Sequence, residues 1–157
     1  MDRRDALPPY RHQPGVTPHP TRDPAGHSFG QGDPFPLEAF DAARARGDAR
    51  FERGIRLFDE GYHWEAHEVW EGAWRATPRE RAEWAFLKGL IQLAAAFVHR
   101  RAGKASAGRI GERGMRHLAD AAGGAGSYAS VDVTALIDAV RAALDDPRVL
   151  APRIPRA

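Results

Sequence analysis

Apolar residues recur three or four positions apart from residue 34 onward, a spacing that places them on one face of a helix. Glycine, proline and cap residues divide this pattern into separate segments. No stretch of useful length alternates apolar and polar positions as a half-buried strand does. The predicted fold class is therefore all-α, an antiparallel multi-helix bundle of five to six helices. They cover residues 34–46, 49–60, 63–75, 78–102 and 104–121, with a last helix between Asp132 and Pro147.

Cap signals predict where these helices begin. Asp33, Asp48 and Asp132 each precede an apolar segment and are predicted N-caps. Thr77 and Glu80 have the spacing of a capping box, which predicts that the longest helix begins directly after Thr77.

The first 33 residues have a different pattern. Residues 1–36 hold eight of the twelve prolines and almost no apolar periodicity, so no helix is predicted before residue 34. We expect three parts: an extended proline-rich arm over 1–33, a helical bundle domain over 34–147 and a C-terminal tail over 148–157. Two interpretations of the arm stay open. Its His19, Asp23 and His27 are solvated turn residues, or the arm packs over the bundle and brings His19 or His27 to a site there.

The amino-acid composition limits which kinds of functional site the chain can form. The chain has 43% hydrophobic and 28% charged residues, which is typical of a globular protein. It has no cysteine, so disulfides, iron–sulfur clusters and cysteine nucleophiles are excluded and any metal must use His, Asp or Glu. The apolar run over 84–98 is too short for a membrane span, and residue 1 onward lacks the apolar region of a signal peptide. We therefore expect a cytoplasmic protein with no membrane partner.

Polar residues line the third and fourth predicted helices. His67 and Glu71 edge the apolar stripe of the third helix, while Gln92 and His99 form a polar seam on the otherwise apolar fourth. Because a short turn joins these helices, we expect them to lie antiparallel and their polar edges to converge.

This convergence leaves two alternatives open. A structural hydrogen-bond network would fix the register of the helices. The other alternative is a ligand or divalent-metal site with His67, Glu71 and His99 as candidate metal ligands. Glu68 and Glu71 are then the candidate catalytic bases acting on a bound water. No cofactor other than a divalent metal ion is indicated.

A different class of function also stays open. The aromatic-rich helical surface, including Trp64, is consistent with an interaction module that binds a partner or a second copy of the chain. Arg109, Arg113 and Arg116 form a basic stripe on the fifth predicted helix that fits RNA or another anion. Without aromatic residues between these arginines in the sequence, a nucleic-acid partner is disfavoured.

The third and fourth helices resemble the bacterial and archaeal helical family known as domain-of-unknown-function family 309. The resemblance lies in EAHEVWE at residues 65–71, in LKGLIQLA at 87–94 and in the distal His99, and it covers roughly residues 50–120. The arm sequence PHPTRDPAGHS also looks like an extension found in part of that family, whereas His63 departs from its pattern. The resemblance implies an all-α bundle and no assigned activity. It also implies a binding cluster of His67, Glu68, Glu71, Gln92 and His99.

Overall fold

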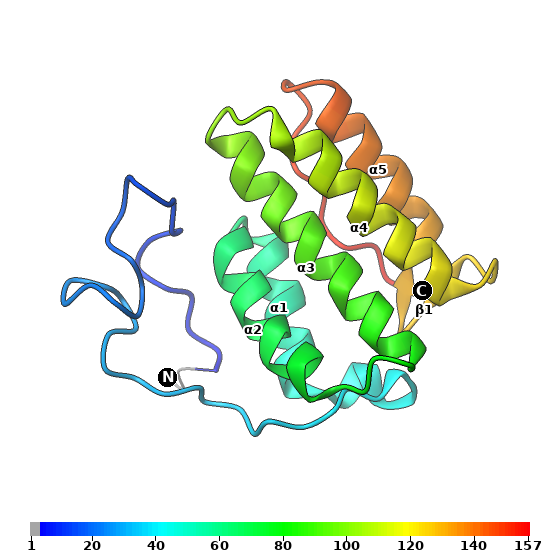
Figure 1. Ribbon diagram of the computed structural model, residues 1–157, viewed down its shortest axis with the longest axis horizontal. Helices are drawn as coiled ribbons and strands as arrows, with labels where there is room; N and C mark the ends of the chain where they lie inside the picture. Colours follow the sequence, from blue (N-terminus) through cyan, green and yellow to red (C-terminus); the bar gives the residue numbers. More distant parts are fainter. Residues whose placement is uncertain (1–3) are drawn as a thin grey trace.

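The computed structural model describes residues 4–157 and confirms the all-α class (Figure 1). Five α-helices, one 3₁₀ helix and a two-stranded sheet make up its regular structure within this range. In chain order they are η1 Ala42–Gly47, α1 Ala49–Asp59, α2 His63–Ala76, α3 Ala82–Arg101, α4 Ser106–Ala122, β1 Ser127–Tyr128, β2 Val131–Asp132 and α5 Val133–Asp145. None of these helices is long and apolar enough to span a membrane.

Helix α3 occupies the centre of the bundle. It lies between the α1–α2 hairpin on one side and α4 on the other, and α5 packs outside α4 (Figure 1). Leu87, Leu90 and Leu93 on α3 are completely buried. A helix that is apolar over most of its circumference is stable only when other helices cover it, which explains why α3 became the centre.

Two close approaches between helices depend on glycine. Gly54 of α1 faces the buried Trp70 of α2, and a Cβ at Gly54 would lie 2.1 Å from the indole nitrogen of Trp70. Gly89 of α3 and Gly114 of α4 similarly face each other, each with its missing Cβ 3.0 Å from the other's carbonyl oxygen. The small residues let the helix axes approach, and neighbouring side chains and backbone fill the space that a Cβ would need.

The first predicted helix is wrong over most of its length. Residues 34–41 are not helical, and the 3₁₀ helix η1 begins only at Ala42, capped by Asp41. Prolines 34 and 36 remove two backbone donors, and Pro36 disfavours helical geometry at Phe35. The predicted cap Asp33 accepts a hydrogen bond from the Phe35 backbone N–H at 3.0 Å.

The predicted capping box at Thr77 is also wrong. The hydroxyl of Thr77 donates to the carbonyl of Ala73 at 2.7 Å and accepts the backbone N–H of Phe40 at 3.0 Å. Helix α3 begins instead at Ala82, after Arg81. A buried N–H needs an acceptor, and the tertiary contact with Phe40 takes the hydroxyl that local capping would have used. Asp48 and Asp132, in contrast, are N-caps as predicted.

The last residues return across the bundle. β1 and β2 form an antiparallel hairpin whose turn holds Ala129 and Ser130 at positive φ, and Val131 also bridges to Arg156. The buried Ile154 donates its backbone N–H to Asp59 at 2.7 Å. The hairpin was absent from the sequence prediction because two-residue strands carry no alternating pattern.

The glycine contacts lead to a paired test in two helices. Gly54→Ala places a methyl group against Trp70, and we expect it to lower the free energy of unfolding by about 2–3 kcal/mol through overpacking. Gly108→Ala, on α4 with open space around the missing Cβ, should raise it by about 0.5–1 kcal/mol through helix propensity. Urea unfolding measures both, and equal effects of the two substitutions would contradict this packing.

Candidate functional site

The N-terminal segment, residues 4–41, is anchored to the bundle by a buried carboxylate. Glu65 lies in the first turn of α2 and is only 5% exposed. Its Oε1 accepts the backbone N–H of His12 at 2.7 Å and faces Nε2 of His27 at 3.1 Å. Burying an ionised carboxylate is strongly unfavourable unless donors replace water. Both donors come from the segment, so Glu65 and the segment stabilise each other.

All three histidines of the segment gather at this end of α2. The rings of His12 and His19 pack edge-on against Trp64, with centroids 4.7 and 5.4 Å from it. Nδ1 of His12 lies 2.8 Å from the hydroxyl of Thr17. Burial is the main cause that lowers the pKa of His12, so its ring stays neutral near pH 7.

Arg50 of α1 anchors the other end of the segment. Its Nη2 pairs with Asp33 at 2.7 Å and its Nη1 donates to the carbonyl of Val69 at 2.9 Å. Gly72 of α2 makes room for this guanidinium, since a Cβ there would lie 2.1 Å from Nη1. The guanidinium also packs 5.2 Å from the ring centroid of Phe35. Arg50 therefore joins the segment, α1 and α2 in one contact.

A cavity of about 420 Å³ lies between these two anchors. Two of its lining residues have a buried polar atom without a hydrogen-bond partner among residues 4–157, namely Arg53 at Nη1 and Glu65 at Oε2. Arg53 is 8% exposed, and its other terminal nitrogen donates to the carbonyl of Ala6. Burial lowers the pKa of Arg53, yet a guanidinium remains charged in proteins. The wall of the cavity therefore holds one cationic donor and one acceptor that have no partner among residues 4–157.

His27 and Ser28 line the same cavity and are joined to Glu65. A carboxylate accepts hydrogen bonds only, so the proton of a neutral His27 ring lies on Nε2, facing Glu65. Nδ1 is then an acceptor, and the hydroxyl of Ser28 lies 2.8 Å from it. The ring of Tyr10 packs at 4.8 Å from that of His27 and holds it in place. Ser28, His27 and Glu65 form a continuous hydrogen-bonded chain.

The predicted cluster on α2 is partly assembled. His67, Glu68 and Glu71 offer ligand atoms within 4.8 Å of one another. His67 Nδ1 faces the carbonyl of Trp64, so this nitrogen carries the ring proton. Its Nε2 lies 3.3 Å from Oε1 of Glu68, and two acceptors at this distance need a proton or a cation between them.

Gln92 and His99 lie elsewhere along α3. Nδ1 of His99 is 2.7 Å from the hydroxyl of Ser106, the first residue of α4. Gln92 packs against α4 at Gly114, and its Oε1 is buried without a partner. Neither residue belongs to the metal-ligand group at His67, the one such group found among residues 4–157.

The comparison with protein families agrees with the helical pattern. Residues 51–110 match the model of the family described as "Domain of unknown function (DUF309)". This part of the chain is therefore similar to the DUF309 family. The match runs from α1 into α4, so it includes Glu65 and Arg53 but not His27 or Ser28. A search of curated proteins found no match to this chain.

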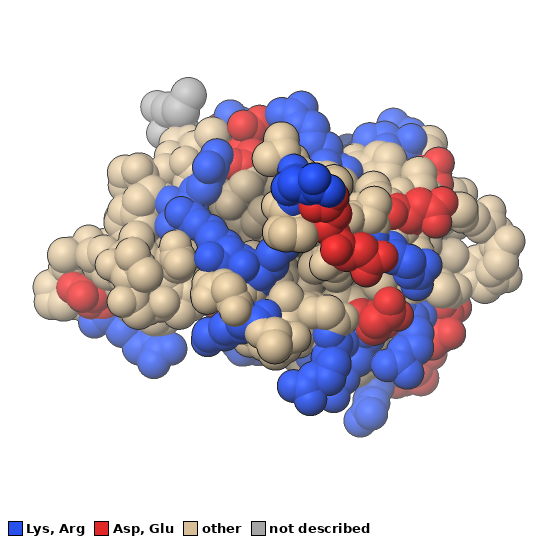
Figure 2. Space-filling view, turned by 90° about the horizontal axis from the view of Figure 1, so that it is seen from above, with Lys and Arg blue, Asp and Glu red and all other residues tan. Residues whose placement is uncertain are grey.

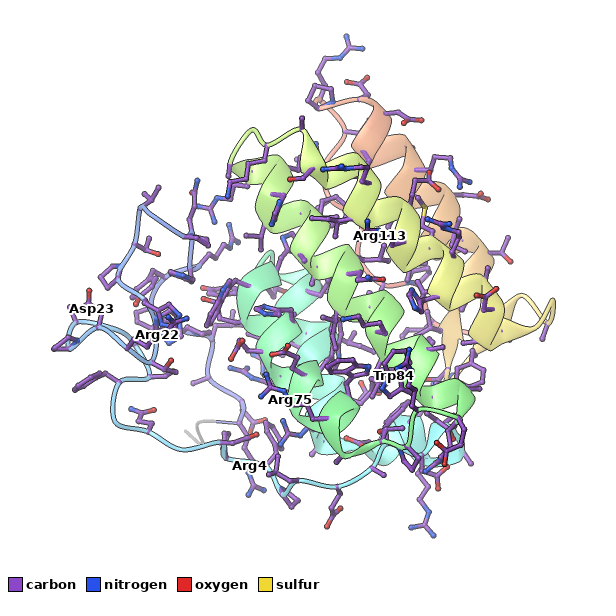
Figure 3. All side chains as sticks on the ribbon, in the orientation of Figure 1. Arg4, Arg22, Asp23, Arg75, Trp84 and Arg113 are labelled. Atoms are coloured by element: carbon purple, nitrogen blue, oxygen red, sulfur yellow. The ribbon has the colours of Figure 1, made fainter. Side chains whose placement is uncertain are left out.

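Sequence reasoning missed His12, Ser28, Arg53 and Glu65. One signal was present, since Gly26-His27-Ser28-Phe29-Gly30 fits the G-x-S-x-G pattern of hydrolase nucleophiles. The strand–turn–helix context of that pattern is absent here, because the segment forms turns. Asp23, in contrast, lies at the outer end of the segment, away from the helices (Figure 3).

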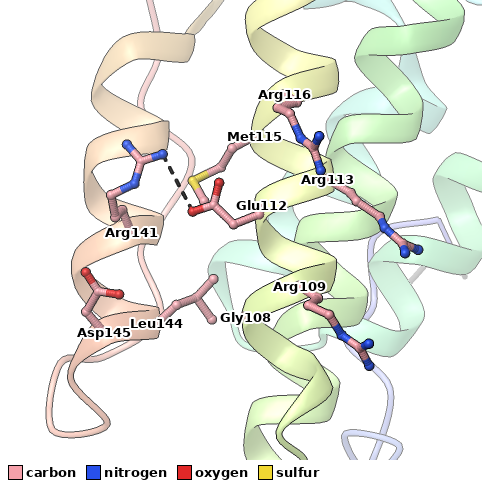
Figure 4. Close-up of a pocket in the computed structure, with 9 residues that line it drawn as sticks. All are labelled: Gly108, Arg109, Glu112, Arg113, Met115, Arg116, Arg141, Leu144 and Asp145. Carbon is pink, nitrogen blue, oxygen red and sulfur yellow. Dashed lines mark ion pairs between the residues drawn. The ribbon is translucent and has the colours of Figure 1, made fainter.

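The predicted basic stripe lies on α4. Arg109, Arg113 and Arg116 point away from α5, whereas Glu112 pairs across the groove with Arg141 at 3.7 Å (Figure 4). None of the three arginines forms an ion pair within the described part of the chain. Seen from above, basic side chains cover much of the surface with acidic ones between them (Figure 2). RNA or anion binding at this stripe stays a prediction.

The burial of His63 can be tested through the pH dependence of protein stability. Its Nε2 is buried without a partner between Phe58 and Phe97, and desolvation, aided by Arg11, Arg101 and Arg100, lowers its pKa to about 4. The unfolded chain binds a proton at this position below about pH 6.5, while the folded chain does not until about pH 4.

We therefore expect His63 to make the protein lose up to roughly 3 kcal/mol of stability as pH falls from 6.5 to 4. Urea unfolding across this range, compared with His63→Leu, isolates the effect, since the variant should lose this share of the pH dependence. His117→Gln on α4 is the matched control and should keep it. A His63→Leu curve parallel to that of the wild type would refute the assignment.

Proposed function

We propose that this protein binds a small molecule with an anionic group in the cavity between its N-terminal segment and helices α1 and α2. One observation carries the proposal. Arg53 and Glu65 line the same cavity, and each has a buried polar atom, Nη1 and Oε2, without a hydrogen-bond partner among residues 4–157.

The energetics favour a ligand there. An unsatisfied buried polar group costs about 1–3 kcal/mol, and more when it is charged. A ligand with an anionic group for Arg53 and a hydrogen-bond donor for Glu65 would remove both penalties together. Leu57, Trp64 and Val69 line the cavity as well and would cover the apolar part of such a molecule. The volume of about 420 Å³ lies within the usual range for small-ligand sites.

A second candidate function is divalent-metal binding at His67, Glu68 and Glu71. The support is the pair of acceptors formed by His67 Nε2 and Glu68 Oε1, which a metal ion would bridge. Imidazole and carboxylate ligands suit zinc and related ions. Glu68 also lines the cavity, so a metal held by it would lie at the edge of the ligand site. Whether Glu68 or Glu71 serves as a general base belongs to this second proposal.

The ligand proposal is tested with a matched pair of probes, 3-phenylpropionate and the uncharged 3-phenylpropan-1-ol. We expect the acid to raise the melting temperature and to bind in calorimetry, and the alcohol to bind at least about tenfold more weakly, because only the acid pairs with Arg53. Arg53→Gln should reduce binding of the acid by about 10- to 100-fold. Arg53→Lys, which keeps the charge, should retain part of it.

Arg109→Gln is the matched control for lost charge, because Arg109 is an exposed arginine on α4 outside this cavity. It should bind the acid as the wild type does. Equal affinity for acid and alcohol, or unchanged binding by a folded Arg53→Gln variant, would overturn the proposal.

The metal proposal is tested by titrating untagged protein with Zn²⁺ in calorimetry. His67→Gln should weaken binding at least about tenfold, because it removes the only nitrogen ligand of the group. His117→Gln, which removes a histidine from α4, is the control and should leave the affinity unchanged. If both variants bind Zn²⁺ as tightly as the wild type, the group at His67 is not the metal site.

A further inference from the structure

We propose that the cavity is a hydrolytic active site in which Ser28 is the nucleophile, His27 the general base and Glu65 the positioning residue. The substrate class is an ester that also carries an anionic group. The anionic part rests on the proposed function, because Arg53 would hold that group. The hydrolytic part rests on a separate observation, the hydrogen-bonded chain of Ser28, His27 and Glu65.

The distances fit these roles. The Ser28 hydroxyl lies 2.8 Å from His27 Nδ1, and His27 Nε2 lies 3.1 Å from Glu65 Oε1. A nucleophile within hydrogen-bond reach of a base that a third group orients is the arrangement that activates serine. All three residues line the cavity. The roles of the two ring nitrogens are exchanged relative to the common serine hydrolase triad, where Nε2 faces the serine.

The backbone around Ser28 is held firmly. Its N–H donates to the carbonyl of Pro20 at 2.9 Å. Gly26 closes the loop where no side chain fits, since a Cβ there would lie 2.3 Å from the carbonyl oxygen of His19. Gly30 follows at φ +69°, a conformation that favours glycine. The hydroxyl is therefore presented by a positioned loop, as catalysis requires.

The structural role of Glu65 does not explain Ser28. Glu65 needs donors to be buried, and His12 and His27 supply them. Neither contact involves the Ser28 hydroxyl, which instead faces His27 Nδ1. A purely structural role would let alanine at position 28 cost some stability, but it would give Ser28 no reactivity, and reactivity is what the experiment measures.

The reaction balances with water as the only co-reactant. Ser28 Oγ attacks the ester carbonyl carbon while its proton moves to His27 Nδ1, and Glu65 stabilises the imidazolium that forms. The bond from carbon to the leaving oxygen then breaks, and His27 returns the proton to that oxygen, releasing the alcohol. Water, deprotonated by His27, attacks the acyl group on Ser28. This releases the carboxylic acid and restores the hydroxyl.

The first experiment detects the nucleophile without using Arg53. Intact protein is treated with diisopropyl fluorophosphate, an uncharged reagent for activated serines, and the modified residue is located by mass spectrometry. We expect one adduct, on Ser28. Ser28→Ala should abolish labelling, and His27→Gln should slow it at least about 100-fold because the base is lost. Ser127→Ala, in the exposed β1 strand, is the control and should be labelled as the wild type is.

The second experiment measures turnover of the 4-nitrophenyl half-ester of glutaric acid, with 4-nitrophenyl acetate as the uncharged comparison. Ser28→Ala should lower kcat for both esters to the background rate. Glu65→Gln should lower kcat at least about tenfold with little change in KM, because it acts through His27. Arg53→Gln should raise KM for the anionic ester only.

The outcomes separate the two proposals. No adduct on Ser28 in protein that still binds 3-phenylpropionate overturns the hydrolytic site and leaves the ligand cavity standing. An adduct on Ser28 with no preference for anionic probes supports the hydrolytic site and overturns the role of Arg53. Labelling that persists in a folded Ser28→Ala variant also refutes the inference. Ser28→Ala removes no contact of Glu65, so the variant is expected to fold.

Discussion

The arrangement of this protein depends on how a buried carboxylate obtains its hydrogen bonds. Glu65 points outward from α2 and away from the helical core, yet it is 5% exposed. A buried carboxylate needs hydrogen-bond donors, and those that Glu65 faces lie outside α2. They come from His12 and His27, 53 and 38 residues away in the chain. The N-terminal segment therefore belongs to the folded structure instead of trailing from it.

The cavity follows from this requirement. Arg50 ties one end of the segment to both helices of the α1–α2 hairpin, and Glu65 ties the other. A segment rich in proline has few side chains that could fill the space between two such anchors, and Arg53 is left beneath it with a free nitrogen. Natural proteins often leave a buried polar group without a hydrogen-bond partner at a functional site, where the function offsets the loss of stability. The DUF309 match begins at residue 51, after this segment. His27 and Ser28 therefore lie outside the matched region, whereas Arg53 and Glu65 lie inside it.

The N-cap signals in the sequence predicted helix starts correctly where no distant residue competed for the capping side chain. Asp48 and Asp132 cap α1 and α5 because each carboxylate is close to the free N–H groups of its own helix. Thr77 has the same kind of local signal, but its hydroxyl accepts the backbone N–H of Phe40, 37 residues away, a partner that a cap signal does not include. Asp33 does accept the nearby N–H of Phe35, but Pro34 and Pro36 disfavour a helix after it.

The sequence alone determined the all-α class, the positions of the main helices, the similarity to DUF309 over residues 51–110 and the absence of thiol chemistry, because periodicity, capping and composition are properties of short stretches. It also indicated His67, Glu68 and Glu71, which lie together because one helix carries them. Only the tertiary structure decided that Ser28, His27, Arg53 and Glu65 share a cavity. The physical reason is that buried charges choose their partners by proximity in space, and a turn-rich segment has no periodicity from which its path could be derived.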